Sequence, residues 1–197
     1  MYGRDVVRRA LDVVVYADVS VPYLDADVRC AVSDLLGDVW DPAAFRSGST
    51  LATASVRGEV VGCALTRHSP AERPVRASPG LRALGPDRYQ EWLAGCPELA
   101  GVAVSVGHRS SGVGSVVVDA VLTPARPRGG WTDLCGRDLA GAGPWLRRRG
   151  WVVAAADRDG AGAVLLAPRH PAATVADRRG ASRGPLTEPG RGRPHRT

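Results

Sequence analysis

Apolar residues follow two different spacings along this chain, and the spacing separates predicted strands from predicted helices. Over residues 11–16 and 50–67, β-branched residues are concentrated in short runs, which is typical of strands. Over residues 25–36 and 113–122, apolar residues recur at intervals of three and four, which is typical of a helix buried on one side. The interleaving of the two patterns predicts a mixed α/β domain.

Shorter signals predict the remaining elements. Arg57 and Gly58 divide the run over 50–67 into a hairpin, because Gly accommodates the positive φ of a tight turn. Residues 69–97 contain five Pro and interrupt the pattern. Further strands are predicted over 98–106, 131–135, 151–156 and 161–167, and further helices over 42–45, 87–94 and 139–149.

Length and composition favour one domain with a basic extension. The chain has 197 residues, and 44% of them are hydrophobic, which is enough for one core. We expect a domain over residues 1–168 and a disordered Gly/Pro/Arg-rich tail over 169–197. No apolar run approaches the roughly 20 residues of a membrane helix, and no secretory signal is evident, so we expect a cytoplasmic protein.

The net charge of +6 is concentrated in that tail. Residues 168–197 hold seven Arg against Asp177 and Glu188, a net of +5, which leaves the rest of the chain at +1. All 26 basic residues are Arg, so the Arg count reflects a compositional bias more than a partner. A nucleic-acid-binding tail remains an alternative hypothesis, but the tail lacks interleaved aromatic residues and is better explained as a solubilising segment.

Cysteine and histidine are scattered. The four Cys lie 33 to 39 residues apart, with no spacing typical of a zinc or redox motif, and the four His are equally dispersed. We therefore expect buried free thiols and no metal site.

The most informative segment is Gly101–Leu122, in which a predicted strand runs directly into a Gly-rich turn and a helix. Such a turn leaves backbone N–H groups without partners at the positive end of the helix dipole, which favours a phosphate or pyrophosphate. Gly112 and Gly114 let the backbone approach the ligand, and Arg109 adds a full positive charge.

Two common phosphate motifs are excluded by single positions. The dinucleotide fingerprint GxGxxG requires a third Gly where this chain has Val117, and a Walker loop requires a Lys that the chain lacks entirely. The pattern that remains over residues 109–114 is Arg-x-x-Gly-x-Gly.

This pattern resembles the pyrophosphate loop of the GNAT N-acetyltransferase superfamily, Arg/Gln-x-x-Gly-x-Gly/Ala. The hairpin sequence SVRGEVVGCAL over 55–65 is similar to the second and third strands of that family, and Trp145–Trp151 resembles its helix end before the sixth strand. The resemblance covers roughly residues 5–168. It implies a mixed, mostly antiparallel central sheet that is flanked by helices and has splayed fourth and fifth strands.

The resemblance also implies a cosubstrate and a reaction. Acetyl-coenzyme A would lie between the splayed strands, and a neutral amine of a small molecule or a protein would attack its thioester. Backbone groups of Val104 and Val106 would bind the pantetheine. The pyrophosphate would contact Arg109, Ser110, Ser111, Gly112, Val113, Gly114 and Ser115. No metal is implied, and the family resemblance is compatible with a homodimer.

The catalytic positions depart from the family pattern. Leu146 stands where many members carry a Tyr general acid, and Gly101 stands where many carry an acidic residue. Glu98 could reach the amine through a water molecule as a general base, or it could be an ordinary solvated residue at a strand start. Asp133 is a second, weaker candidate, and catalysis by positioning alone is a further alternative. The departures leave open a degenerate domain that binds an acyl-coenzyme A without turnover.

Overall fold

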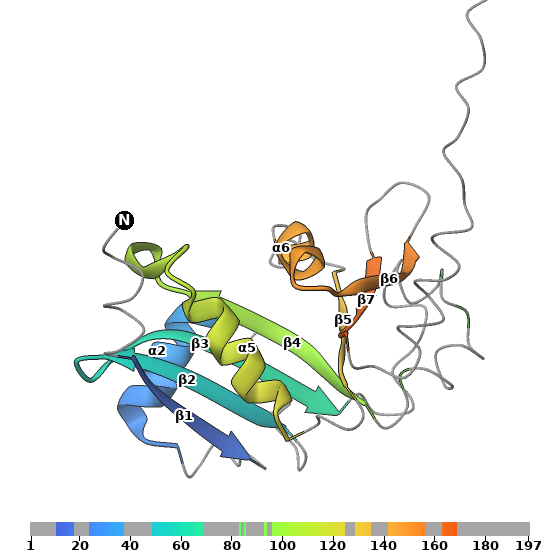
Figure 1. Ribbon diagram of the computed structural model, residues 1–197. Helices are drawn as coiled ribbons and strands as arrows, with labels where there is room; N and C mark the ends of the chain where they lie inside the picture. The colour runs from blue at the N-terminus through green and yellow to red at the C-terminus, as the bar shows by residue number, and fades with distance from the viewer. Residues whose placement is uncertain are drawn as a thin grey trace, which may run out of the picture.

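The computed structural model describes residues 11–17, 24–37, 49–68, 96–124, 129–134, 142–156 and 163–168, together with residues 83, 85 and 93 (Figure 1). The segment 169–197 lies outside the described residues, so the division into a domain and a tail stays a prediction. The predicted helices over 42–45 and 87–94 also lie outside them, apart from Leu93.

Seven strands form one sheet in the order β1-β2-β3-β4-β5-β7-β6. Every neighbouring pair is antiparallel except β4 and β5, which are parallel. The predicted mixed, mostly antiparallel sheet is therefore confirmed, whereas the insertion of β7 between β5 and β6 is not evident from the sequence. The strands span Leu11–Ala17 (β1), Thr50–Val56 (β2), Glu59–His68 (β3), Pro97–Val104 (β4), Trp131–Asp133 (β5), Val152–Ala156 (β6) and Ala163–Leu166 (β7).

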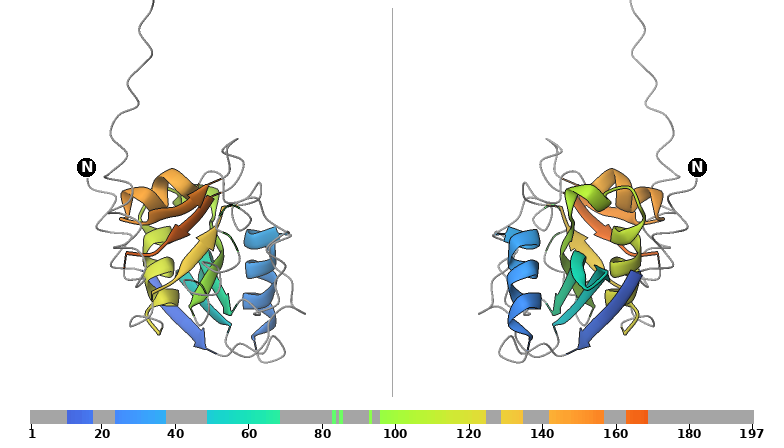
Figure 2. Two further views of the ribbon diagram at one scale, coloured as in Figure 1. Left: turned by 90° about the vertical axis from the view of Figure 1, so that its right-hand side faces the viewer. Right: turned by 90° about the vertical axis from the view of Figure 1, so that its left-hand side faces the viewer.

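Helices cover both faces of the sheet. Helix α2 (Ala26–Leu36) packs on one face, and α5 (Val113–Leu122) and α6 (Ala142–Arg148) pack on the other (Figure 2). Each face buries its own apolar cluster, and burial of apolar side chains is the main favourable contribution to folding. The α2 cluster includes Val32, Leu51 and Cys63, and the α5 cluster includes Leu99, Val117, Leu146 and Leu165.

The hairpin between β2 and β3 has the turn that its sequence predicts. Arg57 has φ of 54° and Gly58 has φ of 84°. Two successive positive φ values are typical of a type I′ turn, whose twist matches that of the flanking strands. The predicted hairpin is confirmed.

β4 ends two residues earlier than the strand predicted over 98–106. Val106 begins a short 3₁₀ turn, η5 (Val106–His108), because the His108 amide donates to the Ser105 carbonyl at 2.9 Å. The prediction that Val106 continues the strand is wrong, and its side chain is 77% exposed. None of the helices in the described part of the chain is long and apolar enough to cross a membrane.

Beside β5, the strand β4 is paired at one position only. Glu98 is in register with Trp131, and the described residues form no further ladder pair between these two strands. One side-chain contact reinforces the junction, because the Thr132 hydroxyl donates to the Leu99 carbonyl at 2.9 Å. The predicted separation of the fourth and fifth strands is confirmed, with Glu98 at the point where they part.

Candidate functional site

The loop from Ser105 to Gly112 connects β4 to α5 through two left-handed residues. Ser110 has φ of 63°, and Gly112, the N-cap of α5, has φ of 95°. Left-handed backbone lets the chain reverse from strand to helix within a few residues, and Gly adopts it without steric cost. The loop begins against β3, because the Ser105 amide donates to the Val61 carbonyl at 2.9 Å.

Several backbone amides of this region donate to no other residue that the structure describes. They are the amides of Ser110, Gly112, Val113 and Gly114. By contrast, the amides of Ser111 and Ser115 donate within the loop, to His108 and Gly112. The N–H groups in the first turn of a helix point outward along its axis, an arrangement that is chemically suited to binding an anion.

Arg109 lies at the rim of this loop. Its side chain is exposed, and its Nε donates to the Val104 carbonyl at 3.4 Å. This long contact directs the guanidinium along the end of β4 and leaves its other N–H groups available. An exposed positive charge beside unpartnered amides is suited to a phosphate group.

A groove of about 490 Å³ runs along the end of β4. One wall is the end of α2, and the other is β4 with the start of the loop. Its described lining comprises Asp34–Leu36, Gly101–Val106 and Arg109. The groove therefore extends from the start of the loop, at Val106 and Arg109, along β4 to Gly101, and it could hold an extended ligand with an anionic end near Arg109.

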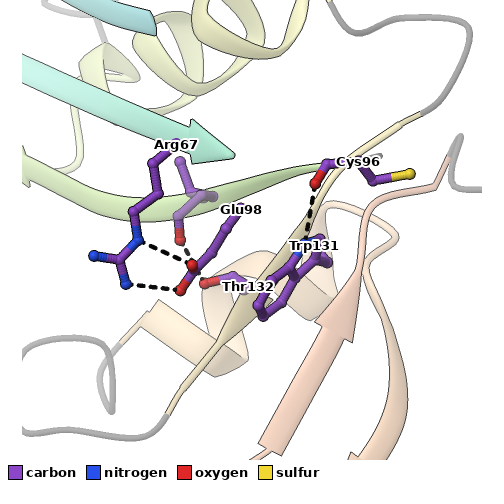
Figure 3. Close-up of polar contacts among 6 residues, drawn as sticks. Arg67, Cys96, Glu98, Trp131 and Thr132 are labelled. Carbon is purple, nitrogen blue, oxygen red and sulfur yellow. Dashed lines mark hydrogen bonds and ion pairs between the residues drawn. The ribbon is translucent and has the colours of Figure 1, made fainter. Parts of the chain in front are cut away.

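Glu98 is buried at the junction of β4 and β5, with only 3% of its surface exposed. Arg67 of β3 lies directly opposite in the register and binds both carboxylate oxygens, Nε to Oε2 at 2.9 Å and Nη2 to Oε1 at 3.2 Å (Figure 3). The interpretation of Glu98 as a solvated residue is wrong. Arg67 occupies about two of the four acceptor positions of the carboxylate, and it was not singled out by the sequence.

The other candidate positions lie near this junction or in the core. Asp133 is buried at the end of β5, and Gly101 lines the groove. Leu146 is completely buried in the α5 cluster, so the position of the usual general acid holds a core residue. As aromatic residues, Trp40, Tyr89 and Trp92 are further candidates from the sequence for lining a substrate pocket, and all three lie outside the described residues.

Two side-chain contacts with His108 stabilise the loop. The Ser105 hydroxyl lies 2.9 Å from His108 Nδ1, and the Ser111 hydroxyl donates to the His108 carbonyl at 2.5 Å. Residues three apart lie on the same side of a 3₁₀ turn. The spacing of Ser105 and His108 is therefore the sequence signal that could have indicated the contact between their side chains. The contact therefore holds η5 in place ahead of Arg109.

The cysteines divide into two environments. Cys63 and Cys96 are buried and form no disulfide, as predicted, but Cys30 is exposed on α2, so the prediction of burial is wrong there. Cys135 lies outside the described residues. Burial raises the pKa of the Cys63 thiol to about 12, which makes it a poor nucleophile. Among the described residues, no three or more His, Cys, Asp or Glu gather in a metal-binding group.

No family model matches this chain, and no curated protein matches it in sequence. Solved structures do match its fold. An acyl-CoA N-acyltransferase from Pseudomonas aeruginosa is similar with a TM-score of 0.53 at 13% identity, over 80% of this chain and 99% of that one.

Two further structures match to a similar degree. An agmatine N-acetyltransferase in its apo form has a TM-score of 0.51 at 13% identity, over 79% of this chain and 100% of the other. The ribosomal-protein-S18-alanine N-acetyltransferase from Escherichia coli has a TM-score of 0.50 at 11% identity, over 81% of this chain and 95% of the other. At these identities the shared property is the fold.

Proposed function

We propose, from the premise that this chain has the GNAT fold, that it transfers an acyl group from acyl-coenzyme A, acetyl-coenzyme A first, to an amine. The observation that carries the proposal is the loop between β4 and α5. It presents amides without described partners at the start of a ten-residue helix, beside Arg109 and a groove of about 490 Å³.

In this proposal the loop binds the pyrophosphate of the coenzyme. The amides of Ser110, Gly112, Val113 and Gly114 donate to its oxygens, and Arg109 adds the full charge. The amides of Ser111 and Ser115 support the loop from within, since both already donate to neighbouring carbonyls. The residues present therefore fit an extended anionic ligand.

The pantetheine arm is proposed to follow the edge of β4 that separates from β5. Val104 lines the groove there, and the exposed Val106 lies at the loop end of the groove. An extended ligand beside an unpaired strand edge satisfies strand amides and carbonyls as a further strand would. This route brings the thioester toward the Glu98 junction.

The reaction forms a C–N bond and breaks a C–S bond. The neutral amine nitrogen attacks the thioester carbonyl carbon, and collapse of the tetrahedral intermediate releases the thiolate, which takes up the proton that the nitrogen loses on becoming an amide. An alkyl ammonium has a pKa of about 10 and must first lose a proton, whereas a thiolate leaving group has a conjugate pKa of about 8.5 and departs without strong acid assistance. A base therefore matters more than an acid, which is compatible with the buried Leu146.

Glu98 is the proposed base, acting through a water molecule. Its carboxylate lies at the junction of β4 and β5, and Arg67 holds it in a fixed orientation. General base catalysis by a positioned carboxylate contributes roughly 10²- to 10⁴-fold to rate. Asp133 is the second candidate, because it is also buried on β5 beside this junction.

A second function is favoured by features of three residues. Both carboxylate oxygens of Glu98 already accept hydrogen bonds from Arg67. Leu146 and Gly101 stand at positions where many members of the GNAT superfamily carry catalytic side chains. A domain that binds an acyl-coenzyme A without turning it over would tolerate these features.

Thiol release from acetyl-coenzyme A in the presence of a panel of amines separates the two functions. We expect amine-dependent release by the wild-type protein. Glu98→Gln should lower the turnover rate by about 10²-fold or more and leave acetyl-coenzyme A affinity unchanged, because the amide keeps the shape but not the basicity. Unchanged turnover in Glu98→Gln would exclude Glu98 as the base. Binding of acetyl-coenzyme A with no release for any amine would favour the second function.

A further inference from the structure

Gly62 of β3 lies beneath the first turn of α5, where the structure leaves no room for a side chain. A Cβ atom at this position would be 2.5 Å from Cγ1 of Val113 and 3.3 Å from the Ala103 carbonyl oxygen. Carbon atoms in favourable contact are about 3.5–4.0 Å apart. The first turn of α5 can therefore lie this close to β3 because residue 62 is Gly.

Val113 cannot relieve such a contact by rotating. It is 2% exposed and packs within the α5 cluster. A Val in a helix is confined almost entirely to one χ1 rotamer. A methyl group at residue 62 would therefore displace the first turn of α5 by about 1 Å from the sheet.

Two adjacent residues of β3, Val61 and Gly62, fix the two ends of the loop. The Val61 carbonyl accepts the Ser105 amide at the start of the loop, and Gly62 sets the position of Val113 at its end. Displacement of α5 alone would move the amides of Gly112, Val113 and Gly114 away from Arg109 and the groove. Hydrogen bonds to amides span only about 2.7–3.2 Å, so a shift of 1 Å is enough to lose one or more of them.

We propose that Gly62 is a positioning residue for the loop from Ser105 to Gly112. It acts through Val113 to set where the loop amides meet the pyrophosphate of the coenzyme. This inference rests on the proposed function, because it requires that the loop binds acetyl-coenzyme A. It extends that function to a residue in another strand that does not touch the ligand.

Gly130 offers a matched control at the opposite end of the same helix. A Cβ atom there would be 2.8 Å from Cδ2 of Leu122 and 3.3 Å from the Pro97 carbonyl oxygen. The two distances are similar to those at Gly62, although the half-buried Leu122 side chain can turn aside more easily than Val113, and the contact falls about 13 Å along the helix from Val113. Gly130→Ala should therefore strain the fold without displacing the loop amides.

The test is calorimetric titration of acetyl-coenzyme A into the full chain and three variants: Gly62→Ala, Gly130→Ala and Gly62→Ala combined with Val113→Ala. Thermal unfolding first sets a temperature at which all four proteins are folded. We expect Gly62→Ala to weaken binding about tenfold or more, equivalent to one hydrogen bond to a charged group. We expect Gly130→Ala to bind as the wild type does, and the double variant to recover affinity because the clashing methyl is gone.

Wild-type affinity in Gly62→Ala, an equal loss in Gly130→Ala, or no recovery in the double variant would overturn the inference. A wild-type protein that is folded and binds no acetyl-coenzyme A would instead overturn the proposed function, and this inference with it.

Discussion

Glycines near the loop serve different purposes, although the sequence presents them as one motif. Gly112 is needed for its backbone, since φ is 95° there. Gly114 lies in the first turn of α5, where a Cβ atom would make ordinary contacts at 3.4 Å with Val104 and 3.7 Å with Trp145. Gly62 is needed for space. The sequence predicts close approach of a ligand at both Gly112 and Gly114, whereas the geometry gives the two residues different roles.

We predict that Gly112→Ala and Gly114→Ala affect stability in opposite directions. Alanine at residue 112 must adopt left-handed backbone, which costs about 1–2 kcal/mol. Alanine at residue 114 fits its surroundings and gains up to about 1 kcal/mol from helix propensity and reduced unfolded-state entropy. Urea unfolding midpoints measure both changes. Equal destabilisation by the two substitutions would show that the loop geometry is wrong.

At the scale of elements, the Arg67–Glu98 pair joins β3 to β4 where β4 leaves β5. The two residues lie opposite each other in an antiparallel register, so their side chains share one face of the sheet. A buried carboxylate without its cation is strongly unfavourable, whereas replacement of a whole buried pair by apolar residues is often neutral or stabilising.

This pair supports a prediction for a double-mutant cycle. Arg67→Met should destabilise the protein by about 2–3 kcal/mol, less than a fully buried pair because Arg67 is 35% exposed. Addition of Glu98→Met should recover most of that loss, since it removes the isolated charge. Denaturant unfolding of the four proteins measures the coupling. If the losses in the free energy of unfolding from the two single substitutions simply added in the double variant, the paired arrangement would be contradicted.

The elements themselves were largely predictable because each carries a local signal. The strands β1 to β3 and helices α2 and α5 follow from apolar periodicity, and the turn at Arg57 and Gly58 from its residues. The end of β4 was not predictable, because the apolar Val106 continues the strand pattern while the His108 amide folds back to Ser105. Hydrogen bonds within a turn override periodicity there.

At the scale of the whole molecule, the sequence predicted the sheet type and the turn from a strand into a helix over 98–122, but not the contacts that assemble them. Arg67 and Glu98 are 31 residues apart, and Gly62 and Val113 are further apart still. Such contacts depend on strand register and helix placement, which no local pattern encodes. The same holds for the insertion of β7 between β5 and β6.

The central claim is that the loop between β4 and α5 binds the pyrophosphate of an acyl-coenzyme A. Calorimetric titration of acetyl-coenzyme A into the wild-type protein and Arg109→Glu tests it most directly, because Arg109 is exposed and its reversal should leave the fold intact. We predict micromolar binding by the wild type and a loss of about tenfold or more in the variant, larger at low salt. Equal affinity in both proteins, or no binding by a folded wild type, would contradict the account.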